Sequence, residues 1–231
     1  MTALLQTALA YRARGWPVFP CHTPTPAGGC SCQQDCGSIG KHPRTKHGLK
    51  DATTDEATIR RWWRQWPQAN IAIATGAVSG LVVLDEDSYK GGDQSRVDLE
   101  HTHSPLPDTV QQLTGGGGVQ YLFAYPGTPV RNGVESLGTG LDIRGDGGYV
   151  VVPPSLHGSG KRYAWELSHQ PDETPLAPMP PWLLALCQET TRRASVSAGE
   201  PIPQGRRNAT FLRSAVRCAR EVSVRRRSLA R

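Results

Sequence analysis

The stretch that decides the fold is residues 81–87, Leu-Val-Val-Leu-Asp-Glu-Asp. Four consecutive apolar residues follow Gly80, which is typical of a buried β-strand. Because side chains alternate between the two faces of a strand, Asp85 and Asp87 are predicted to share one face and Glu86 to lie on the other. Two carboxylates this close need a counter-cation. The alternative is a solvated strand end before the turn Ser-Tyr-Lys-Gly-Gly.

A third carboxylate lies in residues 140–145, Gly-Leu-Asp-Ile-Arg-Gly. Asp142 is flanked by Leu141 and Ile143, so its carboxylate points away from the face that these apolar neighbours share. If this strand lies beside residues 81–86, Asp85, Asp87 and Asp142 form an oxygen-rich site suited to Mg²⁺ or Mn²⁺. Two such ions, about 4 Å apart, would clamp the attacking and leaving oxygens of a phosphoryl displacement.

A glycine-rich turn, residues 115–118, separates these two strands and leads into the apolar run Val-Gln-Tyr-Leu-Phe. Glycines allow backbone N–H groups to approach an anion closely, so Gly116, Gly117, Gly118 and the following Gln120 are candidates for binding a triphosphate. A β-hairpin uses the same residues, and this alternative stays open. Arg144 is a further candidate phosphate contact; its alternative is an ion pair with Asp146 or Glu86.

The remaining chain alternates short apolar runs, bounded by Gly or Pro, with segments of helical period, which predicts a mixed α+β fold. Strands are expected within residues 16–20, 71–76, 80–85, 119–125, 140–145, 148–154 and 161–166, and helices at 2–14, 57–66 and 181–193. Thr54 and Asp55 resemble a helix N-cap with acids in the first turn. Trp62, Trp63 and Trp66 could stack on bases, although core packing is the commoner use of tryptophans at this spacing.

Four of the six cysteines lie in a loop rich in Gly, Pro and Ser, residues 21–47. Thiolates and imidazoles this close together can surround one tetrahedral Zn²⁺ ion. The predicted ligands are Cys30, Cys32, Cys36 and His42, with Cys21 or His22 as substitutes. Four ligands leave no open position, so such a site would be structural. The alternative is a set of reduced thiols without a metal.

Charge is distributed unevenly along the chain. The net charge is +6, but residues 191–231 contain eleven Arg and two acids, which leaves 15 basic and 18 acidic residues in 1–190. A basic tail favours nucleic acid as a partner, and a solvated arm is the alternative. Hydrophobic residues make up 37 % of the chain, and no apolar run is long enough for a membrane helix, so a cytoplasmic protein with no membrane partner is expected.

Several of these motifs occur in an order that resembles a known family. They are Gly-Lys-His-Pro at 40–43, followed by segments 51–63, 70–76, 81–87, 114–123 and 140–155. In this order they are similar to the N-terminal domain of bifunctional DNA primase/polymerases (Prim-Pol) of the archaeo-eukaryotic primase superfamily, over about residues 5–190. The resemblance implies a catalytic unit built around an RRM-like mixed sheet flanked by helices. It also implies that Asp85, Asp87 and Asp142 bind two divalent metals.

The resemblance further implies template-directed synthesis of primers and DNA from nucleoside triphosphates, on a single-stranded DNA template, in a plasmid, phage or integrated-element replication system. The family usually has a His where this chain has Gln120, and an amide cannot carry the charge of an imidazolium. That charge could come from Arg144 or Lys161. A non-catalytic DNA- or origin-binding remnant is the main alternative, and a metal-dependent nuclease is a weaker one.

The C-terminal region is expected to be a linker, residues 191–205, and a basic helical tail, residues 206–231. The tail resembles the start of a helical module that often follows the family's catalytic domain, with apolar positions at helical spacing. Longer relatives continue into a helicase. We therefore expect either a truncated module or a helicase recruited in trans.

Overall fold

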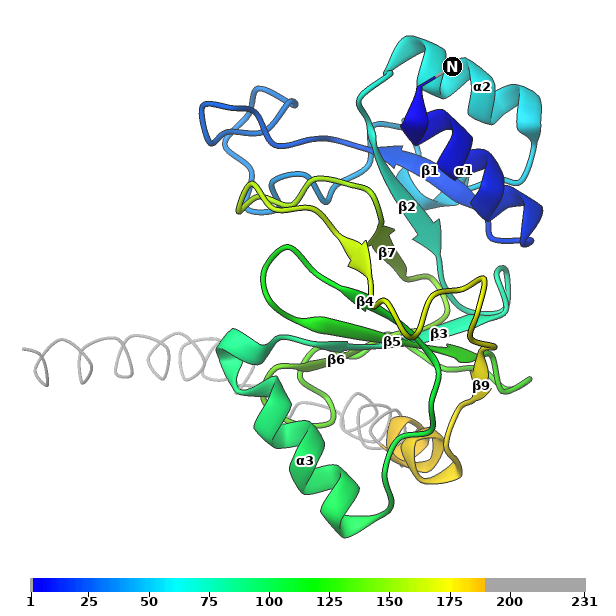
Figure 1. Ribbon diagram of the computed structural model, residues 1–231, viewed down its shortest axis with the longest axis vertical. Helices are drawn as coiled ribbons and strands as arrows, with labels where there is room; N and C mark the ends of the chain where they lie inside the picture. The colour runs from blue at the N-terminus through cyan, green and yellow to red at the C-terminus, as the bar shows by residue number, and fades with distance from the viewer. Residues whose placement is uncertain (1, 190–231) are drawn as a thin grey trace, which may run out of the picture. The chain divides into compact units, whose positions relative to one another are not determined.

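A computed structural model describes residues 2–189 of the chain. These residues form an α+β fold with two sheets, as the alternation of apolar runs and helical segments predicts (Figure 1). The predicted linker, residues 191–205, and basic tail, residues 206–231, lie outside the described residues.

The first sheet has three antiparallel strands in the order β1 (Val18–Cys21), β2 (Asn70–Ala74), β7 (Tyr149–Val152). Two helices, α1 (Ala3–Ala13) and α2 (Glu56–Gln65), pack beside it (Figure 1). Helix α1 begins at Thr2, whose hydroxyl accepts the Leu5 N–H, and α2 begins at Asp55, whose carboxylate accepts the Thr58 N–H at 2.7 Å. Both predicted helices are therefore present and capped by their own side chains.

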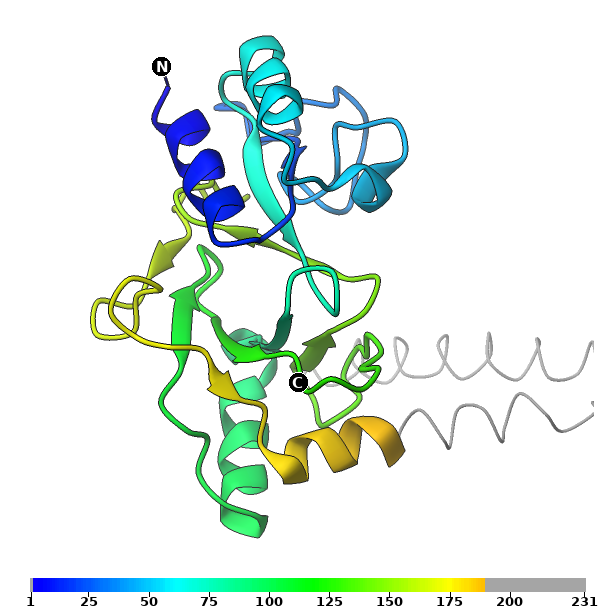
Figure 2. The ribbon, with the colours of Figure 1, turned by 90° about the vertical axis from the view of Figure 1, so that its right-hand side faces the viewer.

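The second sheet has six strands. Its main path is β6 (Leu141–Arg144), β3 (Leu81–Glu86), β5 (Val119–Ala124), β4 (Val110–Leu113), β8 (Ala164–Trp165), all antiparallel, and β9 (Ala177–Pro178) pairs parallel with β5. Helix α3 (Gly92–Thr102) and a helix over residues 181–189 lie on one side of this sheet (Figures 1 and 2). Two one-turn helices, η1 (Gly48–Asp51) and η2 (Ser88–Lys90), complete the elements.

The alternation along β3 explains where the site forms. Val82 and Leu84 belong to the core that includes Leu183, on the side of the 181–189 helix. Leu81 and Val83 belong to the core shared with the three-stranded sheet. Asp85 continues this second series, so it is directed toward the space between the two sheets, whereas Glu86 continues the first series.

The sequence did not predict β4, η1, η2, α3 or β9. No helix among residues 2–189 is both long and apolar enough to cross a bilayer.

Candidate functional site

The two aspartates of the sheet lie opposite each other. Strands β3 and β6 are antiparallel neighbours, and their register places Asp85 directly across from Asp142. Both carboxyl groups are largely buried, with side-chain exposures of 15 % and 12 %. Burial raises the pKa of Asp85; the Gln120 hydrogen bond and the Arg144 charge partly oppose this, and the charges of Asp87 and Asp142 add smaller upward shifts. This is the electrostatic signature of a site that favours a cation.

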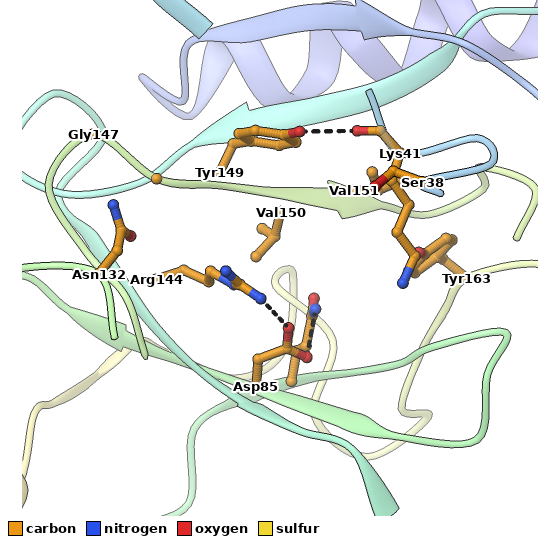
Figure 3. A pocket seen from close by; sticks show the side chains of 12 residues that line it. Ser38, Lys41, Asp85, Asn132, Arg144, Gly147, Tyr149, Val150, Val151 and Tyr163 are labelled. Carbon is orange, nitrogen blue, oxygen red and sulfur yellow. Dashed lines mark hydrogen bonds and ion pairs between the residues drawn. The ribbon is translucent and has the colours of Figure 1, made fainter. Parts of the chain in front are cut away.

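In this structure the cation is Arg144, which is two residues from Asp142 on the same strand face. Its Nη2 lies 2.6 Å from Asp142 Oδ2. The same nitrogen lies 3.5 Å from Asp85 Oδ2 (Figure 3). The alternative partners expected from sequence, Asp146 and Glu86, were wrong. Asp146 instead accepts backbone N–H groups of the neighbouring loops, and Glu86 pairs with an arginine of α3.

Asp87 lies apart from the other two carboxylates. It follows the end of β3, its N–H donates to Gly140 O, and its carboxylate pairs with Lys90 Nζ at 2.9 Å. Within residues 2–189, Asp85, Asp87 and Asp142 do not form a ready-made group of metal-ligating atoms. The structure thus brings two of the three predicted ligands together and leaves the third within electrostatic range.

Gln120 lies on β5, in register with Asp85 on the other side of β3. Its Nε2 donates to Asp85 Oδ1 at 2.8 Å, and its Oε1 accepts a hydrogen bond from Gln112. Gln112 also donates to Val151 O in the other sheet. Gln120 therefore fixes the orientation of the Asp85 carboxylate through a buried chain of amides.

The glycine-rich turn closes the hairpin between β4 and β5. Thr114 N–H donates to Gly118 O, and Gly118 N–H donates to Thr114 Oγ1. A Cβ at Gly118 would lie 2.2 Å from Glu86 O, and one at Gly116 would lie 3.3 Å from the His157 ring. Close packing against Glu86 O therefore requires a glycine at position 118. Residues 116–118 do not line the cleft described next.

A cleft of about 370 Å³ opens above Asp85, between the two sheets (Figure 3). Its floor includes Asp85, Gln120 and Arg144. The rest of the lining comes from the Cys/His loop, from β7 and the turn before it, and from Asn132 and Tyr163, and sequence reasoning missed all of these residues. These additional lining residues are Ser38, Lys41, Asn132, Gly147, Gly148, Tyr149, Val150, Val151 and Tyr163.

Lys41 is the cation that the cleft adds to Arg144. Its backbone carbonyl accepts a hydrogen bond from Tyr149 Oη at 3.1 Å, which ties the loop to β7. Lys161, the alternative source of charge expected from the sequence, does not line the cleft. The signal that could have found Lys41 is its position beside His42, one of the predicted zinc ligands.

The predicted Cys/His cluster is assembled. One ligand atom each from Cys30, Cys32, Cys36 and His42 lies within 4.8 Å of the others, and Cys30 Sγ is 3.2 Å from His42 Nε2. With Zn–S bonds of about 2.3 Å, tetrahedral sulfur atoms lie about 3.8 Å apart, so a small contraction would enclose a zinc ion. Burial raises the pKa of Cys30, but N–H groups of Cys32 and Gly40 outweigh this and bring it to about 6.

The two substitute ligands do not join this cluster. Cys21 is fully buried in the core beside Phe19, and burial raises its thiol pKa well above the usual range. His22 stacks on His42 and its Nδ1 lies 3.0 Å from Ser31 Oγ. The donor set that fits zinc is therefore the primary one, three cysteines and His42.

Comparison with protein families identifies a match that covers most of the chain. The model of the family described as bifunctional DNA primase/polymerase, N-terminal, matches residues 8–182. This range contains both sheets up to β9, the cleft and the Cys/His cluster. No curated protein matches the chain.

Proposed function

The chain belongs to the bifunctional DNA primase/polymerase family, and we propose that it is a template-directed nucleotidyltransferase acting on nucleoside triphosphates. The observation that carries the proposal is the buried Asp85–Asp142 pair, of which Asp85 lies on the floor of a cleft that is also lined by two cations, Arg144 and Lys41. Carboxylates suit metal ions and the cations suit phosphates, so the cleft has both halves of a triphosphate site.

We assign the divalent metal site to Asp85 and Asp142, with Asp87 as the third ligand. Their hard oxygen donors fit Mg²⁺ or Mn²⁺. Bound there, two such ions would favour ionisation of the attacking 3′-hydroxyl and neutralise the departing pyrophosphate. Arg144 now pairs with the same two carboxylates, so on metal binding its guanidinium has to turn away from them, where it can pair with a phosphate instead.

Gln120 and Lys41 are proposed to complete the nucleotide site. Gln120 holds Asp85 by a hydrogen bond and cannot supply a positive charge. Lys41 lines the same cleft and supplies that charge from the opposite wall. Gly116, which lies beside His157, Gly117 and Gly118 remain candidates for contact with the far end of a triphosphate.

The Cys/His cluster is proposed to hold one structural Zn²⁺ ion. Ser38 and Lys41 lie between its third and fourth ligands in the sequence and both line the cleft. Zinc would therefore fix the loop that carries these two side chains, without itself taking part in the chemistry.

We also propose bounds for the domains of the chain. We take residues 5–190 as the catalytic domain, 191–205 as a linker and 206–231 as a basic tail. The six-stranded sheet with its helices on one side is the candidate for the family's RRM-like sheet. The expected partners are a single-stranded DNA template and a helicase recruited in trans, within a mobile-element replication system in the cytoplasm.

Primer extension on a single-stranded template, with Mg²⁺ or Mn²⁺, tests the proposal. Asp85→Asn preserves shape and can still accept the Gln120 hydrogen bond, yet it removes the charge; we expect product formation to fall at least 100-fold. Asp108→Asn is the matched control because the Asp108 side chain is 98 % exposed and lies outside the cleft. Equal activity in the two variants would refute the assigned site.

Two observations favour a second candidate, a non-catalytic DNA-binding relic. Arg144 already pairs with both carboxylates, and Gln120 stands where the family usually has a histidine. For the enzyme, we expect Gln120→His to lower the KM for nucleotide. Absence of product in the native chain, together with retained template binding, would establish the relic and reject the enzyme.

A further inference from the structure

A second hollow lies between α2 and the segment that follows the Cys/His cluster. Its volume is about 810 Å³, and it is open to solvent. We call it the basic groove. Its cationic and aromatic lining residues are Arg44, Lys46, Lys50, Arg61, Trp62 and Trp66.

The charge of the basic groove is strongly positive. Four of its lining residues are permanent cations, and Asp51 is the single acid among them. That carboxylate is already engaged, because it accepts the backbone N–H of His47 and lies 3.0 Å from the His47 ring nitrogen. Lys46, Lys50 and Arg61 are solvent-exposed. The groove therefore presents a concentration of positive charge to any polyanion.

The three tryptophans of α2 have different environments. Trp63 is fully buried in the core, as the sequence favoured. Trp62 and Trp66, four residues apart and hence on one helix face, pack against that core but keep surface in the groove. Arg44 lies over Trp66, with its guanidinium carbon 5.9 Å from the ring centroid. A flat π surface held rigidly beside cations is the combination that binds single-stranded nucleic acid.

Arg44 also connects the basic groove to the Cys/His loop. Its Nη2 donates to Ser31 Oγ at 2.7 Å and its Nε donates to Cys21 O at 3.2 Å. Lys41, which lines the catalytic cleft, is only three residues earlier, and three extended residues span about 10 Å. One continuous strand of nucleic acid can therefore reach both hollows.

We propose that the basic groove binds single-stranded DNA, with its phosphates on Lys46, Lys50 and Arg61 and its bases stacked on Trp62 and Trp66. Naming this strand as the template rests on the proposed polymerase function. The binding itself depends only on the groove.

The charge contacts are tested by anisotropy with a fluorescein-labelled oligothymidine and the full chain at 0.1 M salt. Each lost phosphate contact lowers the single-strand salt slope by about 0.7, which at 0.1 M salt corresponds to about 5-fold in Kd. We expect about 5-fold for Arg61→Ala and about 25-fold for Lys46→Ala/Lys50→Ala. Arg64→Ala is the matched control: Arg64 is exposed on the same helix but outside the groove, and its Kd should change less than 2-fold.

The stacking contact has its own test. Trp66→Leu keeps an apolar side chain on the core but removes the ring, and loss of one stacked base weakens binding by about 5- to 150-fold. Trp66→Phe should retain most of the affinity. Thermal unfolding of each variant shows whether the helix is intact. A fully paired duplex of the same length should bind more weakly than the single strand, because its bases cannot stack on the protein.

The outcomes separate this inference from the proposed function. Equal affinities for the Arg61 and Arg64 variants, or for Trp66→Leu and the native chain, would overturn the groove while leaving the catalytic proposal intact. Groove-dependent binding by a chain that makes no product would support the groove and reject the polymerase.

Discussion

Glu86, which lies between Asp85 and Asp87 in the sequence, should stabilise the fold rather than bind a metal. Its ion pair with Arg96 gives the sharpest test of this role. Glu86 is 3 % exposed, and its Oε2 lies 2.6 Å from Arg96 Nε on α3. Arg96 also bonds to Glu100, and its guanidinium lies over the Tyr121 ring. Removing Arg96 therefore leaves the negative charge of Glu86 buried without its partner.

We choose Arg96→Met because methionine retains much of the apolar stem. With charge centres about 4 Å apart and an effective dielectric constant near 20, the lost attraction is about 4 kcal/mol. Breaking a buried ion pair from one side typically costs about 3–5 kcal/mol, which agrees. For a domain of this size the melting temperature should fall by about 8–16 °C.

The assay is urea unfolding, monitored by circular dichroism. Lys90→Met is the control, because its pair with Asp87 is exposed and should change the free energy of unfolding by less than about 1 kcal/mol. Adding Glu86→Gln to Arg96→Met removes the unpaired buried charge and should recover more than half of the lost free energy of unfolding. A loss below 1 kcal/mol for Arg96→Met, or no recovery in the double variant, would refute the reasoning.

Three further predictions concern the site. Because burial raises the pKa of Asp85, the folded chain prefers the neutral carboxyl group, so the free energy of unfolding should fall as pH rises above the ordinary pKa of 3.8. Asp85→Asn should remove this pH dependence and raise the melting temperature at pH 7. At the proposed zinc site, Cys36→Ser should lower the zinc content per chain, measured after gel filtration, whereas Cys187→Ser, outside the cluster, should not. Gly118→Ala should cost about 1–3 kcal/mol in urea unfolding, because its Cβ would meet a backbone carbonyl, and Gly116→Ala should cost less.

Most of the strands that could be predicted have runs of apolar residues bounded by Gly or Pro. Strand β4, Val-Gln-Gln-Leu, has polar residues in its centre, and only its position beside β5 shows that Gln112 is buried to reach Val151 O. Helix α3 begins with Gly92 and lacks a regular apolar face, so periodicity could not reveal it. These elements form because tertiary contacts stabilise them.

The site was predictable where it depends on one strand at a time. The two-residue period placed Asp85 on one face, and the same period places Asp142 and Arg144 together, a signal that could have identified this ion pair. The register of β3 against β6 could not be predicted, because it depends on long-range pairing. Lys41 was missed for a similar reason: a loop residue is placed by contacts distant in sequence, here with Tyr149.

One wall of the cleft is formed by the Cys/His loop, so the shape of the cleft depends on whether the entropy cost of ordering this loop is offset. Residues 22–47 contain no helix or strand, and ordering each residue costs about 1–2 kcal/mol. A structural zinc ion contributes about 10–16 kcal/mol, comparable to ordering roughly ten such residues. Ser38 and Lys41 lie within the span between two ligands, so a chain depleted of zinc would leave the aspartate floor in place while its opposite wall samples many conformations. Zinc depletion would then resemble a defect in nucleotide affinity rather than loss of the fold.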